Sequence, residues 1–276
     1  MSAELGALVT LERAELLRSR WLWLGCGLYA ALSAAFLGVG LRESSVLGFT
    51  GLGRVLFSLS HALVYLLPLL ALLATGPSIP RAREDGSLEL LLSQPVSRAS
   101  YLCLALGVRW LGLVVPLVVL FLALGGAAAL LGAALPWGFL AQALAVSAAL
   151  LFAFAALGLA LSCTARTSAH ALAALLLAWL AAVALLDFGV IGILLRWQLA
   201  PQAVLVLAAL NPVEAARVAL LAGAEPDLAT LGPVGFYLAA RLGPTGLVAL
   251  GVGWPLAFGG LALAHALRRF CRDDAV

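Results

Sequence analysis

The sequence predicts an all-α, polytopic membrane protein with six transmembrane helices in a single domain over residues 1–276. Of these residues, 64% are hydrophobic and only 11% are charged, whereas soluble domains carry about 25% charged residues. The apolar runs reach about 20 residues, the length of helix that spans a bilayer core. They are rich in Ala, Leu and Gly and lack alternation of polar and apolar residues. Helices are therefore favoured over an outer-membrane β-barrel.

The first element in chain order is an N-terminal amphipathic helix over residues 1–20. Leu5, Leu8, Leu11 and Leu16 recur at near-helical spacing, with charged residues between them. This pattern is typical of a helix that lies on the membrane surface; a solvated tail is the alternative. Six apolar runs follow, and each predicts a transmembrane span. The predicted spans are 21–40, 55–76, 101–125, 139–162, 169–188 and 246–267.

The arginines predict how these spans are oriented. Clusters of arginine precede the first span, lie between the second and third, and follow the sixth, and a single arginine lies between the fourth and fifth. Because cytoplasmic loops are enriched in basic residues, both termini are expected in the cytoplasm, with the protein in a bacterial inner membrane. The arginines concerned are Arg13, Arg18, Arg20, Arg81, Arg83, Arg98, Arg166, Arg268, Arg269 and Arg272.

The segment 189–245, between the fifth and sixth predicted spans, contains a charged pair. Glu214 and Arg217 are three residues apart, so they share one face of a helix and are placed to form an ion pair. A charge pair in the middle of a bilayer is costly. The segment is therefore expected to form re-entrant or outer-surface helices. A seventh span would also place the C-terminal arginines on the wrong side.

Residue types that are absent or scattered exclude several functions. All sixteen basic residues are arginine, so the chain has no Walker A phosphate loop, which needs a lysine. The four cysteines form no CxxC pair, and the sequence has no zinc-protease motif and no paired membrane aspartates. Any ATP chemistry is therefore expected to belong to a partner. No cofactor is expected on this chain, and its surroundings are expected to be the lipid bilayer and protein partners, with no nucleic acid.

Residues 77–98, PSIPRAREDGSLELLLSQPVSR, form a charged, turn-rich island between the second and third spans. Gly86 favours a turn, and Ser87 is placed to cap a short amphipathic helix that follows. This helix is expected either to lie on the membrane or to insert into a groove of a cytoplasmic partner. Its apolar face carries Leu88, Leu91 and Leu92.

The island resembles the loop between the second and third spans of ABC-2-type transporter permeases. The shared pattern is an acidic and basic cluster, then Gly-Ser, a leucine-rich helix and Pro-Val-Ser-Arg. The resemblance implies a type V exporter-like permease whose loop bears the coupling helix that contacts a cytosolic ATPase. It also implies that two copies of the chain pair with two ATPase subunits, which bind the ATP and Mg. The residues expected at the ATPase contact are Arg81, Arg83, Glu84, Asp85, Glu89, Leu91 and Gln94.

Further stretches resemble one subgroup of this family, the permeases of nitrous oxide reductase maturation transporters. They are LVYLLPLLALL before the island, LLDFGVIGILL after the fifth span and LNPVEAARVALL further on. One departure lies early in the third span, where the subgroup commonly has a Gly-Lys pair and this chain has Gly107-Val108-Arg109. The resemblance implies a role in assembling the copper centres of that reductase, with a periplasmic accessory protein as partner. The residues expected to dock the periplasmic partner are Arg196, Asn211, Pro212, Glu214 and Arg217. The alternative is that Asn211 and Pro212 only begin an ordinary helix, with Asn211 as its cap and Pro212 as its first residue.

The sequence predicts no metal site. Cu(I) prefers soft thioether and thiolate ligands, whereas Met1 is the only methionine, and His61, His170 and His265 have no ligand spacing. Transport of a sulfur species, or mechanical drive of the periplasmic partner, is favoured over copper transport. The alternative functions are an ABC-2 exporter of a lipid, drug or polysaccharide, and an ion-coupled transporter. For an ion-coupled transporter, only Arg109 is a candidate ionisable group within a span, and it is expected to snorkel to the cytoplasmic interface.

Overall fold

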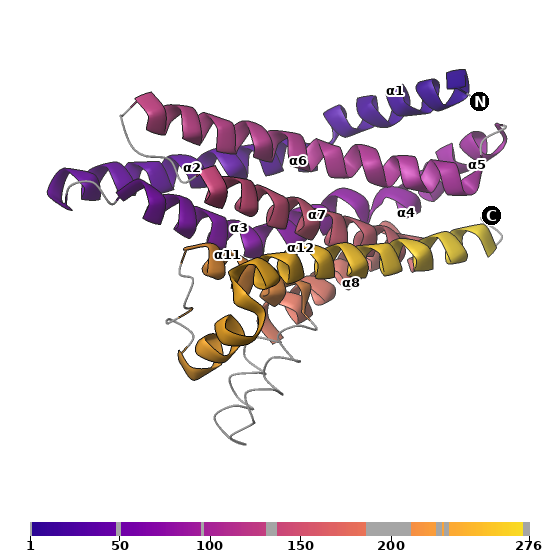
Figure 1. Cartoon of the computed structure of the whole chain (residues 1–276). Helices are drawn as coiled ribbons and strands as arrows, with labels where there is room; N and C mark the ends of the chain where they lie inside the picture. Colours follow the sequence, from indigo (N-terminus) through magenta and orange to yellow (C-terminus); the bar gives the residue numbers. More distant parts are fainter. Residues whose placement is uncertain are drawn as a thin grey trace.

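Every secondary-structure element described in the computed structural model is helical (Figure 1). The structure describes residues 2–47, 51–94, 97–130, 137–185, 211–224, 228 and 232–272. A helix satisfies its own backbone hydrogen bonds, which is why apolar segments of this length fold as helices in a bilayer. The elements are α1 (Ser2–Arg18), α2 (Arg20–Leu47), α3 (Gly51–Thr75), α4 (Ser78–Glu84), α5 (Ser87–Leu92), α6 (Arg98–Leu130), α7 (Trp137–Thr164), α8 (Ser168–Leu180), the π-helical turn η1 (Ala181–Leu185), α11 (Pro212–Ala224) and α12 (Gly232–Arg272).

Four helical stretches in the described part of the chain are long and apolar enough to cross a membrane. They coincide with the second, third, fourth and sixth predicted spans. The first predicted span lies within α2, and the fifth corresponds to a shorter apolar helix, Ser168–Val183. Residues 186–188, the end of the fifth predicted span, lie outside the described residues, and the count of six spans stays a prediction. The four stretches are Leu56–Glu84, Arg98–Gly126, Trp137–Thr164 and Ala240–Arg272.

Helix α7 forms the centre of the bundle. It packs against α3, α6, α11 and α12, and its Leu150, Phe154 and Leu159 are almost completely buried. Glycines allow two of these helices to approach closely. A Cβ atom added to Gly158 would lie 3.2 Å from the Cα of Leu72 on α3, and one on Gly259 of α12 would lie 2.9 Å from an α7 backbone atom. Small residues at helix interfaces bring backbones together in this way in membrane proteins.

The ends of several helices gather at one end of the bundle. The N–H of Ile79, in α4, donates to the Oγ of Ser162 at the end of α7, over 3.1 Å. The rings of Tyr101, in the first turn of α6, and Phe270, in the last turn of α12, have centroids 6.1 Å apart. Figure 1 shows the start of α1, the end of α12 and α5 at this same end of the bundle. The elements predicted to face the cytoplasm therefore share one end of the molecule.

Helix α12 bends at Gly243, just before the predicted start of the sixth span at residue 246. Gly243 has φ 65° and ψ 169°, a conformation in the positive-φ region that glycine adopts without steric cost. Pro244 follows and disfavours helical geometry in the residue before it. The sequence Gly243-Pro244 thus separates the short amino-terminal part of α12 from its long apolar part.

Candidate functional site

The coupling segment, residues 77–98, consists of two short helices, α4 and α5, joined by a tight turn. Gly86 has φ 70°, the left-handed conformation that suits glycine in a turn. The prediction that Ser87 caps α5 is wrong, because Gly86 occupies the N-cap position and the Ser87 hydroxyl donates to the carbonyl of Ala82 over 3.3 Å. The left-handed turn after Glu84 lets α5 begin directly after α4, so no side-chain cap intervenes.

Two charged residues of the coupling segment bind the turn between α7 and α8. The Glu84 carboxylate accepts hydrogen bonds from the backbone N–H of Ser168 at 2.8 Å and from the Ser168 hydroxyl at 2.9 Å. Ser168 is the first residue of α8, where unpaired N–H groups and the helix dipole favour an anion. The guanidinium of Arg83 donates to the carbonyl of Ala165 over 3.4 Å. Arg83 and Glu84, both predicted at the ATPase contact, are thus engaged within the chain.

The outward face of α5 and its neighbouring turn, here called the coupling face, carries Asp85, Glu89, Leu90 and Gln94. All four are exposed, and Leu90 is 72% exposed. In contrast, Leu91, the leucine predicted at the contact, is half-buried against the core. Leu90 was not among the predicted contact residues.

The spacing of α5 gives a signal that identifies Leu90. At 100° per residue, Leu88, Leu91 and Leu92 cluster on one side of the helix and Leu90 falls opposite them. An apolar side chain on the otherwise polar face of a helix is a candidate contact residue. Arg81, also predicted at the contact, is exposed on α4 and lines a cavity beside α1 and α2.

Asn211 lies inside the bundle, where it caps α11. Its Oδ1 accepts from the N–H of Val213 over 3.0 Å, and its Nδ2 donates to the carbonyl of Ala182, in η1, over 2.7 Å. Only 1% of Asn211 is exposed. Helix α11 begins at Pro212, so the capped helix that the sequence offers as an alternative is present.

The predicted ion pair between Glu214 and Arg217 is formed, with 2.9 Å between Oε2 and Nη2. Arg217 also donates to the hydroxyl of Tyr65, on α3, over 2.9 Å. Glu214 is buried, whereas 31% of the Arg217 side chain is exposed. Five residues are predicted to dock a periplasmic partner, and Arg196 lies outside the described residues. Among the other four, only the Arg217 side chain is substantially exposed. Docking at this place stays a prediction.

Arg109 joins the first helix to the bundle. The sequence predicts that it snorkels to the interface; in the structure its side chain is instead buried beneath α1. Its Nη2 lies 3.3 Å from a carboxylate oxygen of Glu12 and 3.3 Å from one of Glu15. Burial raises the pKa of Glu12, and the nearby guanidinium of Arg109 acts in the opposite direction.

Histidines and other metal-binding side chains do not gather in the described part of the chain. No group of three or more His, Cys, Asp or Glu side chains there is placed to hold a metal ion. The His61 ring contacts the Phe57 ring in a tilted arrangement, with centroids 4.2 Å apart, and the His61 Nδ1 lies 3.2 Å from the Phe57 carbonyl oxygen.

Long apolar helices around a buried central helix, with a charged helical segment at one end, define the class of multi-pass helical membrane proteins. Residues 7–275 match the ABC-2 family of transporter proteins, and the chain belongs to this family. It is 34% identical over 269 residues to a protein named "Probable ABC transporter permease protein NosY" from Pseudomonas aeruginosa, covering 94% of this chain and 95% of that protein. A protein of the same name from Stutzerimonas stutzeri is 36% identical over 91 residues, 33% of each chain.

Proposed function

We propose that this chain is the transmembrane subunit of an ABC transporter whose separate cytosolic ATPase acts through the coupling face. Membership of the ABC-2 family implies such a partner, and the chain itself has no lysine for a Walker A loop. The observation that carries the proposal is the exposure of Leu90 among Asp85, Glu89 and Gln94. Leu90 is the one exposed leucine of α5, so it is the apolar side chain of this helix that a cytosolic partner could bury.

The internal contacts of the coupling segment fit this role. A segment that receives force must be held by the bundle and also present a free face. Ile79 and Glu84 attach α4 to the ends of α7 and α8, and Leu88, 1% exposed, anchors α5. Leu90 is left on the outer side. The inner contacts hold the segment and the outer face receives the partner.

The experiment is co-purification of the tagged chain with the ATPase subunit of the same transporter, which carries the Walker A loop and is expressed together with the chain. We expect Leu90→Asp to weaken retention of the ATPase at least about tenfold, since burying one leucine contributes about 1.5–3 kcal/mol and a buried carboxylate is costly. Leu91→Asp is a poorer test because Leu91 packs against the permease core, so this variant would also damage the fold.

Ala99→Asp is the matched control, because Ala99 is exposed at the start of α6, outside the coupling face. It should retain the ATPase and melt like the unsubstituted chain. Normal retention of the ATPase by Leu90→Asp would contradict the assignment of the coupling face. Isolation of an active transporter free of any ATPase would contradict the whole proposal.

We also propose that the transporter functions in nitrous oxide reductase maturation, as a homodimer in a bacterial inner membrane, with both termini in the cytoplasm and a periplasmic partner. The match to NosY proteins over 94% of the chain supports this assignment. Deletion of the gene should then yield a nitrous oxide reductase that lacks copper, restored by the intact chain. A fully copper-loaded reductase in the deletion strain would instead favour an ABC-2 exporter of another substrate.

A further inference from the structure

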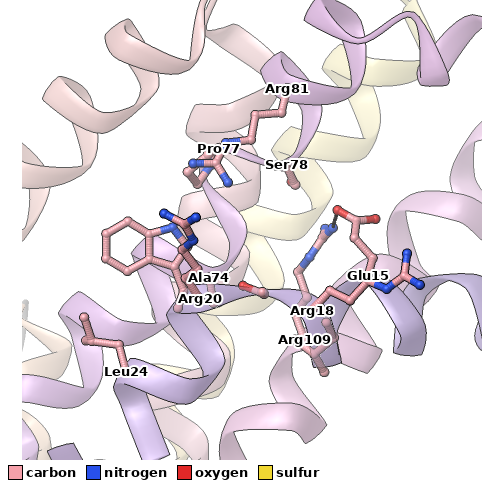
Figure 2. Close-up of a pocket in the computed structure, with 12 residues that line it drawn as sticks. Glu15, Arg18, Arg20, Leu24, Ala74, Pro77, Ser78, Arg81 and Arg109 are labelled. Carbon is pink, nitrogen blue, oxygen red and sulfur yellow. Dashed lines mark hydrogen bonds and ion pairs between the residues drawn. The ribbon is translucent and has the colours of Figure 1, made fainter. Parts of the chain in front are cut away.

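A cavity of about 710 Å³ lies where the junction of α1 and α2 meets α4 and α6. Arginines line it from all four helices: Arg18 ends α1, Arg20 begins α2, Arg81 lies on α4 and Arg109 lies on α6. Figure 2 shows these side chains around the cavity, with Arg109 and Glu15 meeting inside it. The coupling face and the cavity are thus supported by the same short helix, α4.

The charges that line this cavity are strongly unbalanced. Four guanidinium groups face one lining carboxylate, that of Glu15, which leaves a net charge of +3. Glu12 pairs with Arg109 from just outside the lining and reduces the local charge to +2. Within the described residues, Arg18 and Arg20 make no ion pair. Such a concentration of guanidinium groups favours an anion, and phosphate in particular, because their forked donors match its oxygens.

One of the four arginines, Arg109, holds a buried donor nitrogen toward which a ligand could supply an acceptor. Arg109 is only 6% exposed, and its Nη1 is buried without a hydrogen-bond partner among the described residues. A buried, unsatisfied nitrogen of a charged group is costly. An acceptor that enters the cavity would remove this cost, and the carboxylates of Glu12 and Glu15 are already placed at the other nitrogen, Nη2.

Apart from Ser19 and Ser78, the remaining lining is apolar, and it continues onto the outer surface. Leu24 and Trp21 line the cavity, and Leu24 is 51% exposed. Beside them, Trp23 and Leu17 are 64% and 58% exposed, and the Trp23 indole donates to the Leu17 carbonyl. Tryptophan is enriched where membrane spans meet the headgroup layer. A ligand would therefore meet arginines at one end and hydrocarbon-facing side chains at the other.

We propose that this cavity binds the phosphate headgroup of an anionic phospholipid, with its acyl chains lying along Leu24 and Trp23. A soluble phosphate compound shares the headgroup chemistry, but it has no acyl chains to contact the apolar side chains beside the arginines. The lipid would bridge the junction of α1 and α2 to α4 and so attach the first two helices to the coupling segment. This inference depends on the chain being embedded in a membrane. It does not depend on the proposed ATPase contact, because it concerns lipid binding alone.

The test is native mass spectrometry of the full-length chain in a non-ionic detergent. Phosphatidylglycerol, phosphatidylethanolamine of the same acyl chains, and inorganic phosphate are titrated in parallel. We expect phosphatidylglycerol to remain bound and to raise the melting temperature, with weaker effects of the other two. The double variant Arg18→Gln/Arg20→Gln alters two exposed side chains and leaves the buried Arg109 intact. It should bind phosphatidylglycerol about tenfold more weakly, a change of about 1.4 kcal/mol.

Arg268→Gln is the matched control, because it removes one positive charge from an exposed position of α12 that does not line the cavity. Its phosphatidylglycerol affinity should equal that of the unsubstituted chain. Equal affinity of the double variant and the unsubstituted chain would overturn the proposal. So would stabilisation by inorganic phosphate equal to that by phosphatidylglycerol, which would assign the cavity to a soluble phosphate compound. Loss of ATPase retention has no bearing on these binding readouts.

Discussion

Replacing Asn211 by alanine tests whether this residue holds the inner end of α11 in place. The change removes two hydrogen bonds, one accepted from the N–H of Val213 and one donated to the carbonyl of Ala182. Loss of a helix N-cap costs about 0.5–2 kcal/mol, and loss of one further hydrogen bond costs about 1 kcal/mol. Because Asn211 is 1% exposed, water cannot readily replace either partner. The expected loss of stability is therefore about 1.5–3 kcal/mol.

The measurement is thermal unfolding of the purified chain in detergent. For chains of this size, about 1 kcal/mol corresponds to about 2–4 °C in melting temperature, so Asn211→Ala should melt roughly 3–12 °C lower. Asn211→Ser is the matched control, since its hydroxyl can still accept from Val213 but is too short to reach Ala182. It should recover about half of the loss. A melting temperature of Asn211→Ala equal to that of the unsubstituted chain would refute the capping role.

Two further substitutions test helix contacts. Arg109→Gln should destabilise the chain by about 3–5 kcal/mol because it leaves the buried Glu12 carboxylate unpaired. Adding Glu12→Gln should restore part of this loss in the same unfolding assay. A double variant less stable than Arg109→Gln would contradict the pairing. Gly158→Ala should destabilise by about 1–3 kcal/mol because its methyl group would collide with the Thr75 hydroxyl and press on the α3 backbone at Leu72. Gly107→Ala, which meets no atom within 4 Å, should unfold at the original temperature or above it, and an equal loss at both glycines would reject close packing as the cause.

The features that the sequence predicts correctly are those encoded by near neighbours in the chain. Glu214 and Arg217 pair because three residues bring them onto one face of a helix. Asn211 and Pro212 start α11 because an amide acceptor followed by a fixed φ suits the first turn of any helix. Long apolar runs become membrane-length helices because no other structure satisfies their backbones in lipid.

The contacts that the sequence does not predict join residues far apart in the chain. Glu84 meets Ser168 across 84 positions, and Arg109 meets Glu15 across 94. Helical periodicity places each of these side chains on a face of its own helix, but only the packing of the bundle decides which faces meet. Glu84 illustrates the consequence: the sequence shows a carboxylate in a charged loop, but it does not show that this carboxylate accepts hydrogen bonds from Ser168 at the first turn of α8.

The arrangement of these contacts restricts how a push on the coupling face would travel through the bundle. The α4 helix is bound to the end of α7 through Ile79 and Ser162. Further along α7, the Gln142 side chain donates to the carbonyl of Ala219, on α11, over 2.6 Å. Close-packed interfaces transmit strain because they cannot be compressed, and α7 is closely packed along its length. Under the proposed function, α4, α7 and α11 would move together. Helices α1 and α2 both contact α6, and α2 also packs against α3, while the arginine-lined cavity lies between them and α4. An occupant of that cavity would therefore add to these contacts and tighten the connection between the first two helices and α4.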